Sequence, residues 1–249
     1  MAQRMTAPTD LAPWARPIPR ESLSESAYRA MREALAEGRL RPGEPLPLRP
    51  LSQRFEISVT PMREALLRLA TEHLLVMDAR GAASVPQLTV SQIDEILTLR
   101  GDLEGRAAVQ AARIASEAEI DGLAEINLAI IEARDSGRTR DAVRANTLFH
   151  LEICRLARAP ILTEIVEGLW VRSGPLLWHS EDQIHPPWSA RPHLVLIEAL
   201  RARDAEAARE AMLRDVARWS RGYRQYAVPD PDPEPAPGDA PENGAPSGA

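Results

Sequence analysis

The chain has 249 residues, of which 44% are hydrophobic and only 4% aromatic, enough apolar material for one large domain or two ordinary ones. It is acidic overall, with a net charge of −6, and its single cysteine, Cys154, excludes an internal disulfide and fits a reducing compartment. No apolar run approaches the roughly 20 residues that span a membrane, and the first residues contain no apolar signal core, so we expect a cytoplasmic protein.

The first part of the chain predicts a flexible arm over residues 1–20 and a winged helix-turn-helix over residues 21–88. The arm is proline-rich and lacks any periodic pattern. The expected elements that follow are helices over residues 23–40, 49–56 and 60–71 and strands over Leu74–Met77 and Ala83–Pro86. Three helices followed by a hairpin are the outline of a winged helix-turn-helix.

The rest of the chain predicts an all-helical domain over residues 89–227 and a tail over residues 228–249. The tail is acidic, rich in proline and without large apolar side chains, so we expect it to be disordered. Helical periodicity predicts six helices with short connections, over residues 90–115, 117–135, 139–158, 160–178, 189–202 and 204–226. Such a run favours an antiparallel bundle, and the fold class expected is mostly α.

The stretch SVTPMREALLRL, residues 58 to 69, marks the start of the third helix. Thr60 suits the N-cap, and Pro61 would then occupy the first helical position, where its missing amide loses no hydrogen bond. The apolar residues of this helix form one stripe that faces a core. Ser58, Thr60 and Arg63 lie at or near the opposite, N-terminal surface.

This surface predicts contact with DNA. A helix that enters the major groove presents its N-terminal residues to base edges, and its free amides favour phosphate. Arg63 points outward there, Arg49 opens the preceding helix, and Arg80 sits with Gly81 at the hairpin tip. Residues 1–87 are also the only segment with a positive charge balance, although a small one. The alternative is an ordinary amphipathic helix with solvated arginines.

The segments GRLRPGEPL and LSQRFEISVTPMREALLRLATEHLL resemble the DNA-binding domain of the GntR family of bacterial transcription regulators. The resemblance covers residues 22–87 and includes the Pro42-Gly43 turn and the wing ending in Arg80-Gly81. It implies DNA contacts from Arg49, Ser58, Val59, Thr60, Arg63, Arg80 and Gly81. Two positions depart from the family pattern. Val59 stands where an arginine is usual, which implies a different operator or weaker binding, and His73 stands where glycine is common.

The helical half resembles the ligand domain of the FadR-like, or FCD, branch of that family. The segments that carry the resemblance are LRGDLEGRAAVQAARIA, NTLFHLEICRLARAPIL and RPHLVLIEALRARDAEAAREAMLRDV. The two resemblances together cover most of the chain between residues 22 and 226.

Polar residues within the helical domain predict a central site. Asn146 and His150 are four residues apart and share one helix face, while His193 and Asp215 lie on later helices. Polar groups of facing helices can converge in the core of a bundle, where His and carboxylate ligands suit a transition metal. Cys154 is four residues beyond His150, and we interpret it as a core cysteine.

Many members of the FCD branch hold a divalent metal through one Asp and three His. By this resemblance Asn146 replaces the Asp, His150 and His193 are retained, and Asp215 replaces the last His. The implied metal set is His150, His193 and Asp215, for an ion such as Zn, Ni or Mn. The alternative is a hydrogen-bonded polar network without metal.

Two arginines and Asn146 are predicted to bind an effector. Arg100 matches a family position that often faces the ligand cavity, and a buried guanidinium needs an anionic partner, either Glu104 or a ligand carboxylate. Arg172, next to Trp170, is the candidate for a second anion clamp, with a solvated surface arginine as its alternative.

The favoured hypothesis is a ligand-responsive transcription regulator that is not an enzyme. It binds operator DNA as a homodimer, with the helix near residues 90–115 at the interface, and takes a small carboxylate in its bundle. The resemblance implies repression. One alternative is a metal-dependent enzyme that uses His150, His193 and Asp215, although the sequence offers no further nucleophile or base. Another is a constitutive DNA-binding protein with a vestigial cavity.

Overall fold

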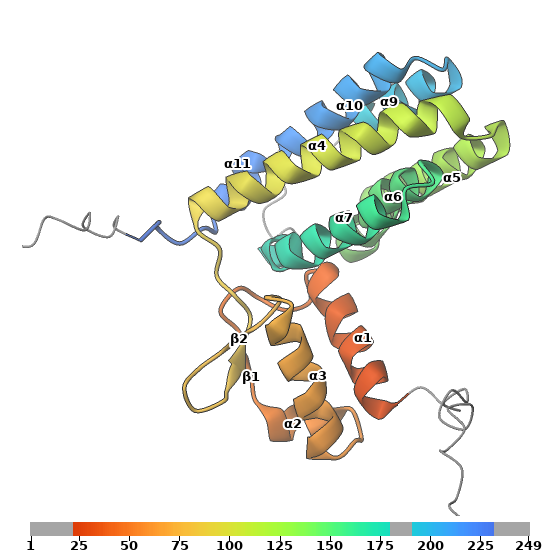
Figure 1. Ribbon diagram of the computed structural model, residues 1–249. Coiled ribbons are helices and arrows are strands. Elements are labelled where there is room, and N and C mark those ends of the chain that lie inside the picture. The colour runs from red at the N-terminus through yellow and green to blue at the C-terminus, as the bar shows by residue number, and fades with distance from the viewer. Residues whose placement is uncertain (1–21, 180–190, 232–249) are drawn as a thin grey trace, which may run out of the picture.

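The computed structural model describes residues 22–179 and 191–231. The predicted arm over residues 1–20 and almost all of the predicted tail lie outside the described residues. The fold is mostly helical, as expected, and its two groups of elements have separate hydrophobic cores. Figure 1 shows the long helices lying together as a bundle, with the smaller N-terminal group beneath them.

The N-terminal group is a winged helix-turn-helix. Its elements are α1 (Leu23–Ala36), β1 (Pro45–Leu46), α2 (Leu48–Arg54), α3 (Val59–Thr71), β2 (Val76–Met77) and β3 (Ala83–Ser84). The strands form an antiparallel sheet of order β1-β3-β2, in which Ser84 pairs with both Pro45 and Val76. Strand β1 was not predicted, because a two-residue strand is too short to show alternation.

The predicted start of α3 is wrong by two residues. The N-cap is Ser58 rather than Thr60, and its side chain makes no capping hydrogen bond. Thr60 and Pro61 therefore lie inside the first turn. The first four amides of any helix lack intrahelical acceptors, so Pro61 loses no hydrogen bond at this later position either.

His73, two positions after the end of α3, is one of the two departures from the family pattern. His73 adopts a positive φ of 57°, the left-handed conformation that glycine takes at least cost. The amide of Leu74 then bonds to the carbonyl of Leu69, which closes the helix end. The backbone geometry that favours glycine is thus retained with a histidine in its place.

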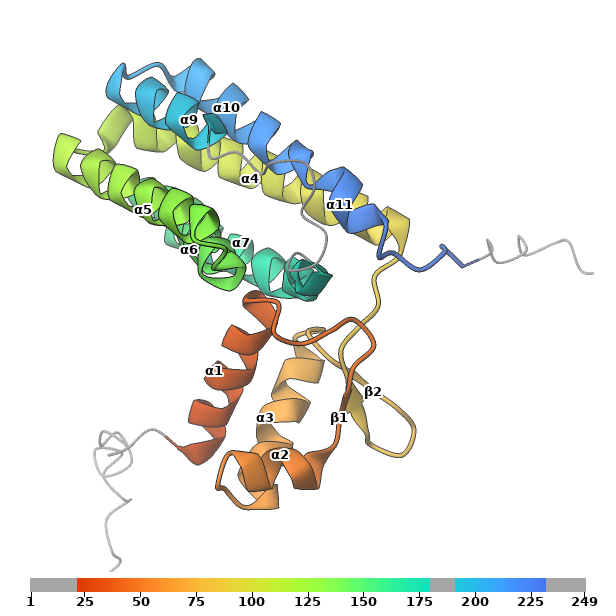
Figure 2. The same cartoon turned by 180° about the vertical axis from the view of Figure 1, so that it is seen from behind.

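The helical domain is built from eight elements. They are α4 (Val90–Ile114), α5 (Glu117–Asp135), α6 (Thr139–Leu156), α7 (Pro160–Ser173), the 3-10 segment η2 (Gly174–His179), α9 (Arg191–Arg201), α10 (Ala205–Arg218) and α11 (Ser220–Arg224). Helix α4 packs on α10 and α5 on α6, and α4 also contacts α6, α7 and α9. Figure 2 shows from behind that α4, α9, α10 and α11 lie along one side and α5, α6 and α7 along the other.

Several predicted helices end earlier than expected, as the first does at Ala36, and two in the bundle end for a visible reason. The helix predicted over residues 160–178 is α-helical only to Ser173, because Pro175 has no amide to continue the ladder. The helix predicted over residues 204–226 breaks at Trp219, whose amide bonds to the carbonyl of Val216 three residues back. The break produces the separate helix α11, which carries Tyr223.

The start of α4 is held by the C-terminal end of the described chain. Thr89 caps α4 through a reciprocal box with Gln92, and it forms a parallel bridge with Val228. The amide of Val228 donates to the carbonyl of Leu88, and the carboxylate of Asp230 accepts from the amide of Ser91 at 3.2 Å. The connection between the two domains is therefore clamped by residues that follow α11.

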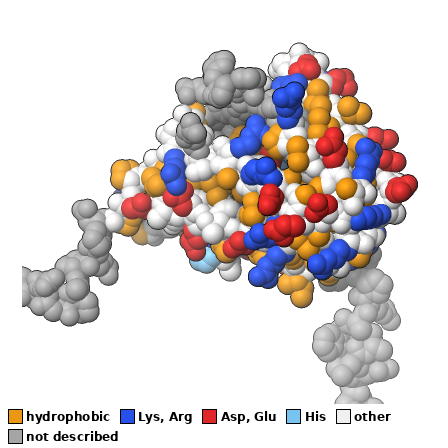
Figure 3. Space-filling model, turned by 90° about the horizontal axis from the view of Figure 1, so that it is seen from above, with side chains coloured by type: hydrophobic (Ala, Val, Ile, Leu, Met, Phe, Trp, Pro, Cys, Tyr) orange, Lys and Arg blue, Asp and Glu red, His pale blue; other side chains and the backbone are white. Residues whose placement is uncertain are grey.

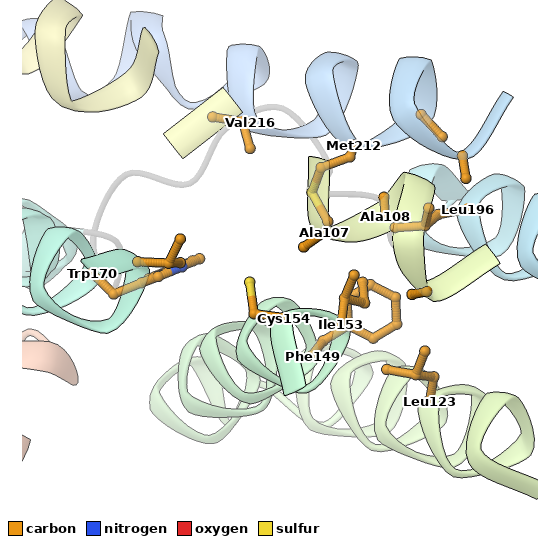
Figure 4. Close-up of a cluster of buried hydrophobic side chains, with 14 of the residues drawn as sticks. Ala107, Ala108, Leu123, Phe149, Ile153, Cys154, Trp170, Leu196, Met212 and Val216 are labelled. Carbon is orange, nitrogen blue, oxygen red and sulfur yellow. The ribbon is translucent and has the colours of Figure 1, made fainter. Parts of the chain in front are cut away.

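The bundle encloses a hydrophobic core and has a charged exterior. Figure 4 shows Phe149, Ile153 and Cys154 of α6 near Trp170 of α7 and Met212 and Val216 of α10. Acidic and arginine side chains are interspersed over the face in Figure 3. Some exposed charges of the bundle pair along one helix, as Arg214 and Glu210 of α10 do. Within the described residues, no helix has the length and apolar character that crossing a membrane requires.

Candidate functional site

The predicted DNA-contacting residues lie on α2, on α3 and its N-cap, and in the turn between β2 and β3, all in the winged domain. All seven are exposed: Arg49, Ser58, Val59, Thr60, Arg63, Arg80 and Gly81. Val59, the first residue of α3, exposes 39% of its surface although it is apolar. The hydroxyl of Ser58 is not used to cap the helix, so it too is available to a partner.

The arginines of α3 divide into two kinds. Arg68 pairs with Glu25 at 2.5 Å and with Glu72 at 3.3 Å, and its guanidinium lies 3.7 Å from the centre of the Tyr28 ring. Arg63, by contrast, makes no ion pair with any residue that the structure describes. Arg68 therefore holds α1 and α3 together, whereas the exposed charge of Arg63 is not used in this way.

The wing tip is shaped by Asp78. Its Oδ1 accepts hydrogen bonds from the amides of Arg80 at 2.9 Å and Ala82 at 2.8 Å, and Gly81 takes a φ of 79°. This tight turn leaves Arg80 exposed at the tip.

The predicted metal-ligating residues come together in the bundle core. His150 lies on α6, His193 on α9 and Asp215 on α10, and all three are buried. The Nε2 atom of His150 lies 3.1 Å from Oδ2 of Asp215, and that of His193 lies 3.5 Å from the same oxygen. One ligand atom from each residue lies within 4.8 Å of the others. The bundle thus joins residues that the sequence separates.

Hydrogen bonds on the far side of each imidazole fix its orientation. Nδ1 of His150 lies 2.6 Å from Oε2 of Glu104, and Nδ1 of His193 lies 3.0 Å from Oδ1 of Asn127. A carboxylate and an amide oxygen can only accept, so each Nδ1 donates. Both Nε2 atoms therefore face Asp215, with lone pairs when the rings are neutral, an arrangement that a proton or a metal ion between them would stabilise.

The pKa values show how the site is balanced when the cation is a proton. Burial lowers the pKa of His150, but the charges of Glu104 and Asp215 and the hydrogen bonds to them outweigh burial and raise it to about 9. Burial keeps the pKa of His193 below its ordinary value. Burial would raise the pKa of Asp215, yet the neighbouring His150, through its hydrogen bond and its charge, holds it below its ordinary range. Without a metal, the site therefore favours a charged His150 beside the Asp215 carboxylate.

Arg100 forms the other end of the same network. Its guanidinium is fully buried, Nε donates to Oε1 of Glu104 at 2.7 Å, and Cζ lies 3.5 Å from the centre of the Trp170 ring. Glu104 therefore joins Arg100 to His150. Burial raises the pKa of Glu104, but the charge of Arg100 outweighs it, and the net pKa lies below the ordinary value.

Unpartnered polar atoms concentrate in this network. Apart from Nε of Arg32, every buried side-chain nitrogen or oxygen that lacks a hydrogen-bond partner among the described residues belongs to the bundle. The atoms are Nη1 and Nη2 of Arg100, Nδ2 of Asn127, Oδ1 of Asn146, Nε2 of His150, Nε1 of Trp170, Oδ2 of Asp215 and OH of Tyr223. Such atoms are costly to bury, so their concentration indicates that polar groups from outside the chain belong here.

One predicted effector-binding residue lies elsewhere, and Cys154 lies in the core as expected. Arg172 is not part of the buried network, because its Nη2 donates to the carbonyl of Glu72 at 3.3 Å, at the contact with the winged domain. Cys154 packs in the hydrophobic cluster, where burial raises the pKa of its thiol. Asn146 is buried one turn before His150, as predicted.

Sequence reasoning missed three members of the network. Glu104 was considered only as a partner for Arg100, not for His150. Asn127 interrupts the buried apolar stripe of α5 that contains Ile120, Leu123 and Ile130, and that interruption was a readable signal. Tyr223 gave no signal beyond its helical position.

A winged helix-turn-helix joined to a helical bundle is the architecture of a DNA-binding transcription regulator with an all-helical second domain. Residues 23–85 match the gntR family of bacterial regulatory proteins, and residues 95–218 match the FCD domain. The chain belongs to the GntR family, whose members bind operator DNA.

Known relatives agree with this assignment. The chain is 33% identical over 195 residues to the HTH-type transcriptional regulator McbR of Escherichia coli K12, covering 77% of this chain and 88% of McbR. It is 25% identical over 215 residues to the HTH-type transcriptional repressor RspR of the same organism, covering 86% and 94% of the two chains. The solved structure of E. coli McbR/YncC aligns with a TM-score of 0.75 and 32% identity, over 83% of this chain and all of that one. These relatives are transcription regulators rather than enzymes.

Proposed function

We propose that this protein is a dimeric repressor whose operator affinity responds to a small carboxylate and a divalent metal bound in its bundle. The observation that carries the proposal is the convergence of two oriented imidazoles on Asp215, beside a buried arginine with free donors. The relative RspR is a transcriptional repressor, which supports repression as the sign of regulation.

The DNA-reading half of the proposal assigns the exposed surface around the start of α3 to the major groove. Arg63 reaches base edges or phosphate, Ser58 and Thr60 offer hydroxyls, and Arg49 and Arg80 contact the flanking backbone. Paired heads in a dimer read two half-sites, because one head of this size makes few base contacts.

The residues present fit a divalent metal. Two imidazole nitrogens and a carboxylate oxygen face one another, and each imidazole is oriented by an acceptor on its other nitrogen, as metal-ligating histidines usually are. His150, His193 and Asp215 would hold the ion, with the carbonyl oxygen of Asn146 as a further donor one turn away. A bound ion would supply Lewis-acid coordination of an anionic ligand.

Charge balance supports a carboxylate as the ligand. With a proton on His150, the two positive groups Arg100 and His150 match the two negative groups Glu104 and Asp215. A divalent ion in place of that proton leaves one positive charge in excess. Free donors surround this charge, on Arg100, Trp170 and Tyr223, and they suit an anion with two acceptor oxygens.

The test combines footprinting with calorimetry on the full-length protein. Footprints on the DNA upstream of its own gene, with and without candidate carboxylates, should show a protected palindrome that weakens or strengthens with one acid. Titration with Zn²⁺ should show one tight site per chain, lost in His150→Ala. Absence of a footprint contradicts the DNA-reading half, and Zn²⁺ binding unchanged in His150→Ala contradicts the sensor half.

A further inference from the structure

The winged domain is fastened to the bundle by consecutive residues at the end of α7. Val171 is buried with the hydrophobic core of the winged domain, not with that of the bundle. Arg172 donates from Nη2 to the carbonyl of Glu72, the C-cap residue of α3, at 3.3 Å. The C-terminal end of α3 is therefore held by α7 of the helical domain.

The backbones are also in close contact at this junction. A Cβ added to Gly174, directly after α7, would lie 2.1 Å from the carbonyl oxygen of Leu35 in α1. A Cβ added to Gly38 would lie 2.9 Å from Cβ of Leu177. Because no side chain separates the backbones at Gly174 and Leu35, a shift at the end of α7 would displace α1, which packs on α3.

The opposite face of the same helix turn belongs to the buried site. Trp170 is 1% exposed, its ring covers the guanidinium of Arg100 at 3.5 Å, and it lies 5.1 Å from the His150 ring between centroids. Trp170 and Arg172 are two positions apart, so their side chains point about 200° apart while their Cα atoms differ by only about 3 Å along the axis. One turn of α7 thus contacts the buried site through Trp170 and the C-terminal end of α3 through Arg172.

We infer that Arg172 is a positioning residue that couples the buried site to the placement of α3. When Arg100 and His150 rearrange, Trp170 moves with them. Val171 and Arg172 then transmit this movement to the winged domain. The inference rests on the proposed function, since it assumes that the site is occupied and that α3 reads DNA. It assigns to Arg172 a role at the domain contact instead of the effector contact that the sequence predicted.

The experiment measures how Zn²⁺ changes DNA affinity in variants of Arg172. A fluorescent duplex selected by the wild-type protein from a random library is titrated at fixed salt, with saturating Zn²⁺ and again after the metal has been removed by chelation. We expect the wild-type Kd to differ at least about 5-fold between the two conditions, within the usual range of allosteric coupling. In Arg172→Ala the ratio of the Kd values with and without Zn²⁺ should fall below about 2-fold, because the coupling is lost.

Two variants separate coupling from simple loss of structure. Arg172→Lys can still donate one hydrogen bond to the Glu72 carbonyl and should recover part of the response. Arg155→Ala removes an exposed arginine of α6 and should keep all of it. Calorimetry should give Arg172→Ala the wild-type affinity for Zn²⁺, since Arg172 is not a ligand, and thermal melts should show that it is folded.

The outcomes are distinguishable. A wild-type response that persists in Arg172→Ala overturns this inference alone. A wild-type Kd that does not depend on Zn²⁺, although the metal binds, also overturns it. A wild-type protein that binds neither the duplex nor Zn²⁺ overturns the proposed function, and this inference with it.

Discussion

The Nδ1 atom of His193 lies 3.0 Å from Oδ1 of Asn127, a residue 66 positions earlier in the chain. Since an amide oxygen only accepts, this contact orients the ring and keeps Nε2 directed at Asp215. We expect Asn127→Leu to weaken Zn²⁺ binding by about 10- to 100-fold, the usual cost of losing such a partner. Calorimetry would measure it. Asn127→Asp keeps an acceptor and should stay near wild type, and equal affinities for all three proteins would refute the role.

Removing metal should lower the melting temperature of the wild-type protein. Free Zn²⁺ at 100 times its Kd stabilises the folded state by about 2.7 kcal/mol, and chelation removes that contribution. Asp215→Asn takes a ligand from the site, so its melting temperature should respond little to Zn²⁺ or to chelator. Differential scanning calorimetry with and without chelator checks both proteins. A shift of the same size in Asp215→Asn would show that the metal binds elsewhere.

Mutations of Arg63 and Arg68, both on α3, should affect different properties, DNA affinity in one case and stability in the other. Arg63→Ala should weaken operator binding by about 1–3 kcal/mol if the residue reads a base, and leave thermal stability unchanged. Arg68→Ala loses its partners Glu25 and Glu72 and its stacking on Tyr28, so its melting temperature should fall. Duplex titrations and thermal melts of both variants would measure the contrast. Wild-type DNA affinity in Arg63→Ala would contradict the assigned reading surface.

The start of α5 should contribute to acid sensitivity. Hydrogen bonds from Arg158 and from Ser116 lower the pKa of Glu119 to about 2. Because the folded-state pKa lies below the unfolded one, the contribution of Glu119 to stability is complete above its ordinary pKa of 4.5 and is lost as the pH falls toward 2. Stability should therefore fall less between pH 5 and pH 3 in Glu119→Gln than in wild type.

Glu117→Gln is the matched control for this pH prediction. Glu117 is an exposed acid two residues earlier on the same helix. Urea unfolding at both pH values should give it the wild-type slope. A Glu119→Gln slope equal to that of the control would show that the Arg158 contact does not hold in solution.

The sequence by itself determined the fold class, the family and the surface expected to read DNA. These depend on short-range patterns: apolar periodicity predicts each helix, and the Ser-Val-Thr-Pro-Met-Arg segment marks the start of α3 to within two residues. The identities of the proposed metal ligands also followed from the sequence, through resemblance. Helix ends were less well predicted, as at Ser173 and Trp219, where a proline or a change of hydrogen-bond register ended the α-helix.

Only the tertiary structure decided what the polar residues contact. Glu104 meets His150 across 46 positions, and Arg172 meets Glu72 across 100. No local pattern specifies such partners, because they depend on how helices pack and on which turn of each faces the core. Because of this packing, Arg172 lies at the contact between the domains and not in the effector site that the sequence predicted for it.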